Sequence, residues 1–215
     1  MTFEKRLRII FRIIGSVLFA CLIFLPVSGR AEQKGAAEVV QRMNSTLMEN
    51  MKRAQVLGFS GRYKQLDPVI RDVFALSYMG EKTLGSYWNT ISQEQRKQYL
   101  DLYAVWTISS YAGSFDGYSG EKFEIEAGEH IKGDMATVIS NLVIPHEESV
   151  DFNYTLRRFQ DKWRIVDIRT SGVSQLSLTR SQFVGLMKSK GFDGLMAALK
   201  EKIALIHARG IQGKL

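Results

Sequence analysis

The sequence has almost no cysteine. Its 215 residues include one, Cys21, which falls in an N-terminal segment that we expect to be removed. A domain without it has no disulfide, no thiol nucleophile and no cysteine ligand for a metal. The sequence therefore predicts a domain held together by the packing of its core alone.

Histidines and catalytic motifs are also scarce. The three histidines, His130, His146 and His207, lie in different predicted elements and form no short metal-ligand spacing. The sequence contains no G-x-S-x-G elbow, no P-loop and no dinucleotide-binding glycine fingerprint. We therefore expect neither a metal site nor a cofactor.

Clustered basic residues are absent as well. The chain has 29 basic and 22 acidic residues, a net charge of +7. Its first 31 residues hold five of the basic and one of the acidic residues, so the remaining 184 residues carry 24 and 21, a net charge of +3. A nucleic-acid-binding face needs a clustered basic patch, so no nucleic-acid partner is expected. The small surplus favours at most an anionic membrane surface or an acidic partner.

Only one long apolar run is present, and it lies near the N-terminus. Residues 13–27 follow a start with four basic side chains and precede a short polar stretch at residues 28–31. This order is typical of a secretory signal peptide, and the run is shorter than the ~20 residues that span a bilayer. We expect cleavage after Ala31, leaving residues 32–215 as one exported domain. A retained N-terminal anchor is the alternative.

The spacing of the apolar residues predicts helices, then strands, then helices. Spacings of three and four predict helices over residues 35–57, 68–78, 80–88, 92–111, 178–190 and 193–208. Ser92 and Gln95 form a capping box, Asp67 and Pro68 predict a helix start, and Gly113 predicts a helix end. Alternation predicts an antiparallel meander over residues 122–126, 136–144, 150–157 and 163–170. This order is typical of an α+β fold.

Two features of the sequence suggest chemistry, and each has a structural alternative. Asp167 is a carboxylate in an apolar strand, where it is either a buried general base or an acceptor of backbone hydrogen bonds at a strand end. The many aromatic and methionine side chains either line a pocket for an apolar ligand or form an ordinary core.

Several stretches in a fixed order resemble the MlaC family, also called the toluene-tolerance auxiliary proteins. The resemblance runs from about Ala36 to Ile206. Its most specific pieces are Leu84-Gly85 with Tyr87-Trp88, Glu94-Gln95-Arg96, Tyr118 through Gly120-Glu121, Trp163 with Val166-Asp167, Gly172-Val173-Ser174 and Arg180-Ser181-Gln182-Phe183. Within this family, the hopanoid-associated branch HpnM is one candidate for the subgroup of this chain.

The resemblance implies a non-catalytic periplasmic lipid shuttle. On this reading, a curved antiparallel sheet packs against helices around an apolar cavity that holds the lipid tails, with the polar head near the mouth. The cargo is phospholipid or hopanoid, carried between the inner and outer membranes. The partners are membrane-anchored transport proteins at the two membranes.

Within this expected fold we predict eleven cavity residues. They are Phe74, Leu84, Trp88, Tyr103, Trp106, Val138, Phe152, Tyr154, Val166, Ile168 and Val173. Strand parity places Phe152 with Tyr154, and Val166 with Ile168, on shared faces. The alternatives are a small-pocket periplasmic enzyme of the NTF2-like type that uses Asp167, and a ligand-free scaffold for a membrane transporter.

Overall fold

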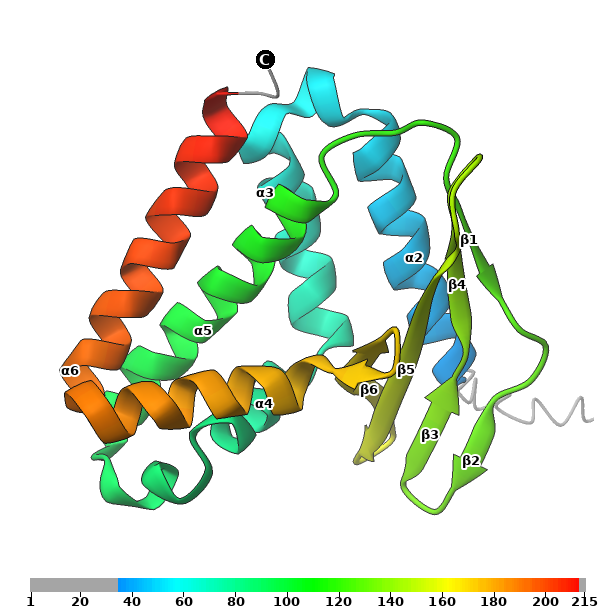
Figure 1. The fold of residues 1–215 in the computed structure, drawn as a ribbon. Coiled ribbons are helices and arrows are strands. Elements are labelled where there is room, and N and C mark those ends of the chain that lie inside the picture. The colour runs from blue at the N-terminus through cyan, green and yellow to red at the C-terminus, as the bar shows by residue number, and fades with distance from the viewer. Residues whose placement is uncertain (1–34, 213–215) are drawn as a thin grey trace, which may run out of the picture. The chain divides into compact units, whose positions relative to one another are not determined.

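The computed structural model describes residues 35–212, so the predicted leader and its cleavage site at Ala31 lie outside the described part. The helices are α2 (Ala36–Lys52), α3 (Ala54–Val73), α4 (Leu76–Leu84), the 3₁₀ helix η1 (Gly85–Thr90), α5 (Gln93–Ser114) and α6 (Gln175–Gln212). The strands are β1 (Lys122–Ile125), β2 (His130–Lys132), β3 (Met135–Val138), β4 (Ser140–Val143), β5 (Val150–Phe159), β6 (Lys162–Thr170) and β7 (Val173–Ser174). The order of helices, strands and a final helix confirms the α+β fold (Figure 1).

The first predicted helix, over residues 35–57, is divided in the structure. α2 ends at Lys52, and α3 contains a break at Gly58, whose φ of 57° is a left-handed conformation that glycine adopts without strain. The predicted helix start at Pro68 is wrong, because Pro68 lies inside α3. Proline removes one helical hydrogen bond, and the burial of Leu66 and Ile70 on one face of this helix offsets that loss.

The strongest helix prediction is confirmed at its start and extended at its end. Ser92 Oγ accepts a hydrogen bond from Gln95 N at 3.1 Å, and Gln95 Oε1 accepts one from Ser92 N at 2.9 Å. Gly113 does not end α5. A Cβ at Gly113 would lie 2.9 Å from Ile206 Cγ2 of α6, so this glycine permits the two helices to approach closely.

The strands form an antiparallel sheet, as predicted. β1–β4–β5–β3–β2 is the pairing path, and β6 pairs with β5 and β7. The predicted strand over residues 136–144 is two strands, β3 and β4, which pair with successive parts of β5. β2 and β7, of three and two residues, were not predicted, because such short strands show no clear alternation.

A β-bulge changes which residues of β6 share a face. Tyr154 pairs with Ile168 and Leu156 pairs with Ile165, with a register shift between Thr155 and Leu156. Ile165 and Ile168 therefore share the face of Tyr154, and Val166 occupies the extra position of the bulge. Strand parity would place Ile165 on the face opposite to Ile168, so the bulge is what brings Ile165 onto this face.

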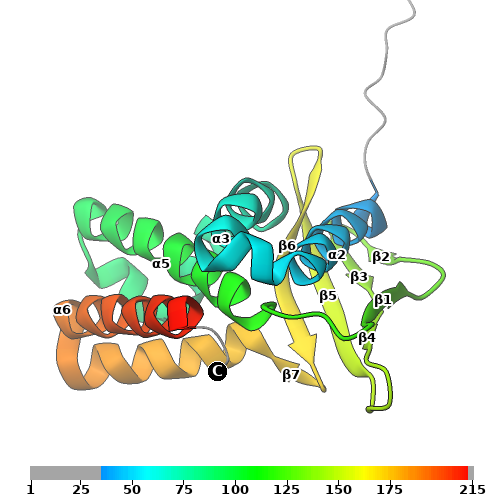
Figure 2. The same ribbon diagram turned by 90° about the horizontal axis from the view of Figure 1, so that it is seen from above.

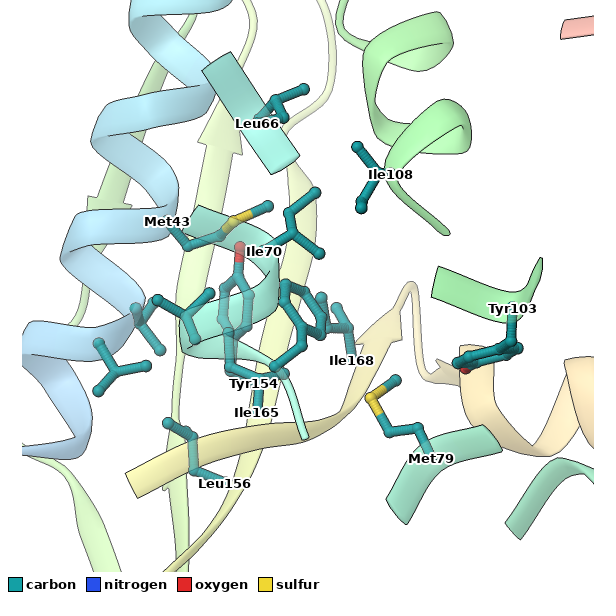
Figure 3. Packing of buried hydrophobic residues seen from close by; sticks show 14 of the residues in the cluster. Met43, Leu66, Ile70, Met79, Tyr103, Ile108, Tyr154, Leu156, Ile165 and Ile168 are labelled. Carbon is teal, nitrogen blue, oxygen red and sulfur yellow. The ribbon is translucent and has the colours of Figure 1, made fainter. Parts of the chain in front are cut away.

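Helices cover one face of the sheet (Figures 1 and 2). α2 lies directly on it and contacts β1, β3 and β6. Figure 3 shows Tyr154 in the core between this helix and β6, with Met43 of α2, Ile70 of α3 and Ile165 of β6 around it. α6 turns at Gly191 (φ 67°), so its two parts run in different directions along α4 and α5 (Figure 1). No helix in the described part has the length and apolarity needed to cross a bilayer.

Candidate functional site

A cavity of about 520 Å³ lies between α5, the helix-covered face of the sheet and the first turns of α6. Residues from the α3–α4 junction and from α4 complete its wall. The lining residues are Phe74, Met79, Tyr103, Trp106, Thr107, Ser110, Tyr111, Ser114, Phe115, Leu142, Val150, Phe152, Ile168, Thr170, Gln175, Leu176 and Thr179. Its volume is within the range of ~300–1,000 Å³ that is usual for small-molecule sites.

One face of α5 supplies the helical wall of this cavity. Tyr103, Thr107, Ser110 and Ser114 follow one another at spacings of three and four, so they lie on one side of the helix. Thr107 Oγ1 donates to the carbonyl oxygen of Tyr103 at 2.9 Å, and Ser110 Oγ donates to that of Trp106 at 2.8 Å. Because these hydroxyl protons are bonded within the helix, they need no partner from a ligand.

Aromatic rings from the sheet, from α5 and from the α3–α4 junction form a continuous layer along the cavity. The ring centroid of Phe152 lies 6.3 Å from that of Phe115 and 5.7 Å from that of Phe123. Phe115 stacks on Tyr111 at 5.9 Å, and Tyr111 lies 5.6 Å from Phe74. Offset and edge-on contacts of this kind stabilise the layer beyond its buried area.

The cavity wall carries no ionised side chain. No aspartate, glutamate, lysine, arginine or histidine is among the residues that line it. Desolvation raises the pKa of both Tyr103 and Tyr111 well above the usual range, so these phenols remain neutral at physiological pH. The wall therefore matches an apolar molecule, because a buried charge on a ligand would have no partner there.

Five of the eleven predicted cavity residues line this cavity: Phe74, Tyr103, Trp106, Phe152 and Ile168. They come from α5, β5, β6 and the α3–α4 junction, so the fold brings them together from distant parts of the sequence.

The other six predicted residues lie outside the wall. Leu84 and Val138 are fully buried in the main core. Trp88 lies on η1, where the Arg96 guanidinium carbon is 4.9 Å from the ring centroid. Val166 is buried at the bulge, and Val173 is 52% exposed on β7.

Tyr154, the sixth, is on the same strand face as Phe152 but lies in the packed core. It is 1% exposed, and its hydroxyl donates to Asn44 Oδ1 of α2 at 2.7 Å. Asn44 Nδ2 in turn donates to Ser140 Oγ of β4 at 3.0 Å. The three buried groups form a chain of two hydrogen bonds, and this chain holds α2 on the sheet.

Several wall residues were not predicted from the sequence. Tyr111 and Phe115 continue the α5 stripe, so their helical spacing was a usable signal. Leu142 and Val150 face the cavity because of strand pairing, and Gln175, Leu176 and Thr179 do so because α6 begins beside β6. No local sequence pattern identifies the members of this second group.

Asp167 has a structural partner instead of a position in the cavity. Its Oδ1 accepts a hydrogen bond from Leu176 N at 3.0 Å, in the first turn of α6. Ser174 Oγ accepts another from Ser177 N at 3.0 Å. Together they satisfy two backbone donors that a helix start leaves without partners. Within residues 35–212, no group of three or more histidine, cysteine, aspartate or glutamate side chains is arranged to hold a metal ion.

Comparisons with known proteins agree with one another. A family model described as the MlaC protein matches residues 38–201. The intermembrane phospholipid transport system binding protein MlaC of Haemophilus influenzae is 28% identical over 131 residues, which are 59% of this chain and 61% of that protein. The matched segment thus spans less than two thirds of the relative's length.

A solved structure shares the fold. The phospholipid-binding protein from Ralstonia solanacearum, determined in complex with a phospholipid, superimposes with a TM-score of 0.71. The match covers 82% of this chain and 100% of that chain, at 19% sequence identity.

Proposed function

This chain belongs to the MlaC family, and from that membership we propose that it is a non-catalytic lipid carrier. The carrier binds a phospholipid by its acyl chains in the cavity beneath α5. The domain that we propose for this function comprises residues 32–215.

The observation that carries this proposal is the uncharged, aromatic-lined cavity of about 520 Å³. Exposing an acyl chain to water costs about 0.8 kcal/mol for each CH₂ group, or roughly 13 kcal/mol for a sixteen-carbon chain. A lipid therefore cannot cross an aqueous compartment at a useful rate unless a protein covers its chains. The cavity supplies such a cover without any catalytic group, metal or disulfide.

The absence of a cation from the cavity wall also indicates how the lipid is oriented. A phosphate group placed among these residues would be a buried charge without a partner, which is costly. In the proposed complex the acyl chains therefore occupy the cavity and the polar head remains outside it.

We further propose phospholipid as the cargo and the periplasm as the location. The named relative is a component of an intermembrane phospholipid transport system, and the protein that shares the fold was solved with a phospholipid. The leader-like residues 1–31 support export. Transport between the inner and outer membranes, exchange with membrane-anchored transport proteins, and a hopanoid cargo in place of phospholipid are finer proposals of the same kind.

Native mass spectrometry of the purified protein, followed by lipid extraction, tests the function. We expect one or more bound phospholipids, whereas a hopanoid in the extract would support the alternative cargo. Leu176→Glu places a carboxylate on the cavity wall and should abolish lipid retention. Leu178→Glu is the matched control, because Leu178 lies two residues further along α6, is 46% exposed and is outside the wall. Lipid-free wild-type protein, or equal loss in both variants, would contradict the proposal.

The location has a separate test. N-terminal sequencing of protein recovered from the periplasm should begin at Glu32 if cleavage follows Ala31. Recovery only in the membrane fraction, with Met1 intact, would show an anchored protein instead of a free shuttle.

A further inference from the structure

A second cavity, of about 540 Å³, lies on the other side of Phe74 from the apolar cavity. It is bounded by the end of α3, the first turn of α4, the middle of α5 and the turn between β5 and β6. Phe74 lines both cavities, so the two cavities are neighbours in the fold. Figure 2 shows the β5–β6 hairpin, in yellow, beside α3 at this end of the sheet.

The two cavities differ in charge. Arg71, Lys162 and Arg164 line the second cavity, whereas no charged side chain lines the first. The one acidic residue that lines the second cavity is Asp101, and its carboxylate accepts a hydrogen bond from Lys97 Nζ at 2.7 Å. Arg71 Nε donates to Asp67 Oδ1 at 2.9 Å. Arg164 Nη1 donates to the backbone carbonyl oxygen of Arg71 at 3.4 Å. The lining therefore combines three cationic side chains with one carboxylate, which leaves a surplus of positive charge.

The electrostatics of a neighbouring carboxylate are consistent with this surplus. The hydrogen bond from Arg42 lowers the pKa of Asp72, and the charges of Arg164 and Lys162 lower it further. One carboxylate is thus shared among three cations, and it is already hydrogen-bonded to one of them. The region keeps a net positive potential toward the cavity.

The floor of the second cavity is aromatic. Tyr78 and Phe159 line it together with Phe74, and the Tyr78 and Phe159 rings meet edge-on at 5.6 Å. A concave site with walls of low polarity concentrates the field of the charges at its rim. The planar guanidinium of Arg164 suits the oxygen atoms of a phosphate, and Lys162 adds a compact charge.

We propose that this second cavity binds a phosphate group through Lys162 and Arg164. The group belongs either to a lipid headgroup or to a small free phosphate compound, which share the same recognition chemistry. The site is distinct from the acyl-chain cavity, so it can be present or absent whether or not the protein carries lipid.

Isothermal titration calorimetry of the purified full-length protein with inorganic phosphate tests the site. We expect binding that the double variant Lys162→Gln/Arg164→Gln weakens at least tenfold, as expected for the loss of charged hydrogen bonds. The control, Lys132→Gln/Arg169→Gln, removes the same charge from exposed positions outside the cavity. It should change the affinity by less than about twofold, because distant surface charges are screened. Absence of phosphate binding by the wild type, or equal weakening in the two double variants, would overturn the proposal.

A second variant tests the same site without removing a cation. Ala75 lines the second cavity but not the first, and it is the residue before α4, which has no side-chain cap. Ala75→Asp adds a carboxylate to the wall at a position where aspartate favours helix formation. We expect a folded protein, by circular dichroism, with phosphate affinity reduced at least tenfold. Unchanged affinity in this folded variant would count against the site.

Dihexanoyl phosphatidic acid, used below its micelle concentration, distinguishes the two sources of phosphate. Binding at least tenfold tighter than that of inorganic phosphate, and equally sensitive to Lys162→Gln/Arg164→Gln, identifies a lipid headgroup. Equal affinities for the two probes identify a free phosphate compound. Binding of the lipid probe that is insensitive to the double variant would place it elsewhere and contradict a headgroup at this site.

Discussion

Phe152 and Tyr154 show how two residues on one strand face acquire different roles. Alternation along β5 was enough to predict that both side chains lie on the same face of the sheet, but not which face that is. It did not predict that α2 covers Tyr154 while Phe152 remains beside the open cavity, because the position at which α2 crosses the sheet depends on contacts between residues far apart in the sequence. The hydrogen bond from Tyr154 to Asn44 joins residues 110 positions apart.

This difference predicts opposite results for the same substitution at the two positions. Tyr154→Glu places an unpaired charge in the core and should lower the free energy of unfolding by about 3–5 kcal/mol. Phe152→Glu places the charge at the cavity, where water can reach it once the ligand has left, so the protein should stay folded but lose bound lipid. Thermal melting by circular dichroism, with the lipid content of each variant, measures both effects. A folded Phe152→Glu variant with normal lipid content would show that this residue does not contact the ligand.

Ile165 shows where strand parity fails for single residues, because it shares a face with Ile168, three positions away. Strand parity works only while every residue has one partner, and the bulge between Thr155 and Leu156 breaks that condition. Nothing in the sequence of β6 marks the bulge, since neither glycine nor proline occurs in Lys162–Thr170. Asp167, by contrast, has the role that its place near a strand end suggested, as an acceptor of a backbone hydrogen bond.

At the scale of elements, local signals predicted the long strands and the start of α5 but not the start of every helix. The Ser92–Gln95 box is a local interaction and appears in the structure as expected. The predicted helix start at Pro68 was wrong because tertiary packing can offset the cost of a proline inside a helix. That packing depends on how much apolar surface the neighbouring side chains bury, which the local sequence does not show. The contribution of α6 to the cavity wall likewise depends on where that helix lies after folding.

The turn at Gly191 in α6 provides a prediction at this scale. Its φ of 67° and ψ of −169° belong to a region that only glycine adopts readily, and no atom lies within 4 Å of a Cβ built there. Gly191→Ala should therefore lower the free energy of unfolding by about 1–3 kcal/mol through backbone strain alone. Gly185→Ala, in the same helix and also without neighbours within 4 Å, is the control and should raise it by up to ~1 kcal/mol. Urea unfolding measures both values, and equal effects would contradict the assigned backbone strain.

At the scale of the whole described molecule, the cavity is assembled from segments separated in sequence. α5 provides one wall, β4 to β6 a second and the start of α6 a third. Each segment shows its own apolar pattern in the sequence, but the pattern is the same whether the apolar side chains meet one another or leave a space between them. The fold class was therefore predictable, whereas the boundary between core and cavity was not.

Because the cavity exists only when these segments come together in the folded state, bound lipid should stabilise the protein. A ligand present at about 100 times its Kd adds about 2.7 kcal/mol, which raises Tm by roughly 5–10 °C for a domain of this size. Removal of lipid from the wild type should lower Tm by that amount, whereas Leu176→Glu, which should carry no lipid, should melt at the same temperature before and after extraction. Differential scanning calorimetry measures the shifts. An unchanged wild-type Tm on extraction would argue against a ligand that contacts the folded state.

The separation of Asn44 and Tyr154 in the sequence also means that α2 is made well before β5, on which Tyr154 lies. The 110 residues that separate these partners take roughly 5 s to produce at a rate of ~20 residues per second. During that interval the apolar side of α2, with Met43 and Leu47, has been made, but β5 and β6 have not. The nascent chain must therefore be kept from aggregating through this surface for several seconds, and a shortened chain that ends before β5 can bury only part of it, against α3, β1 and β3.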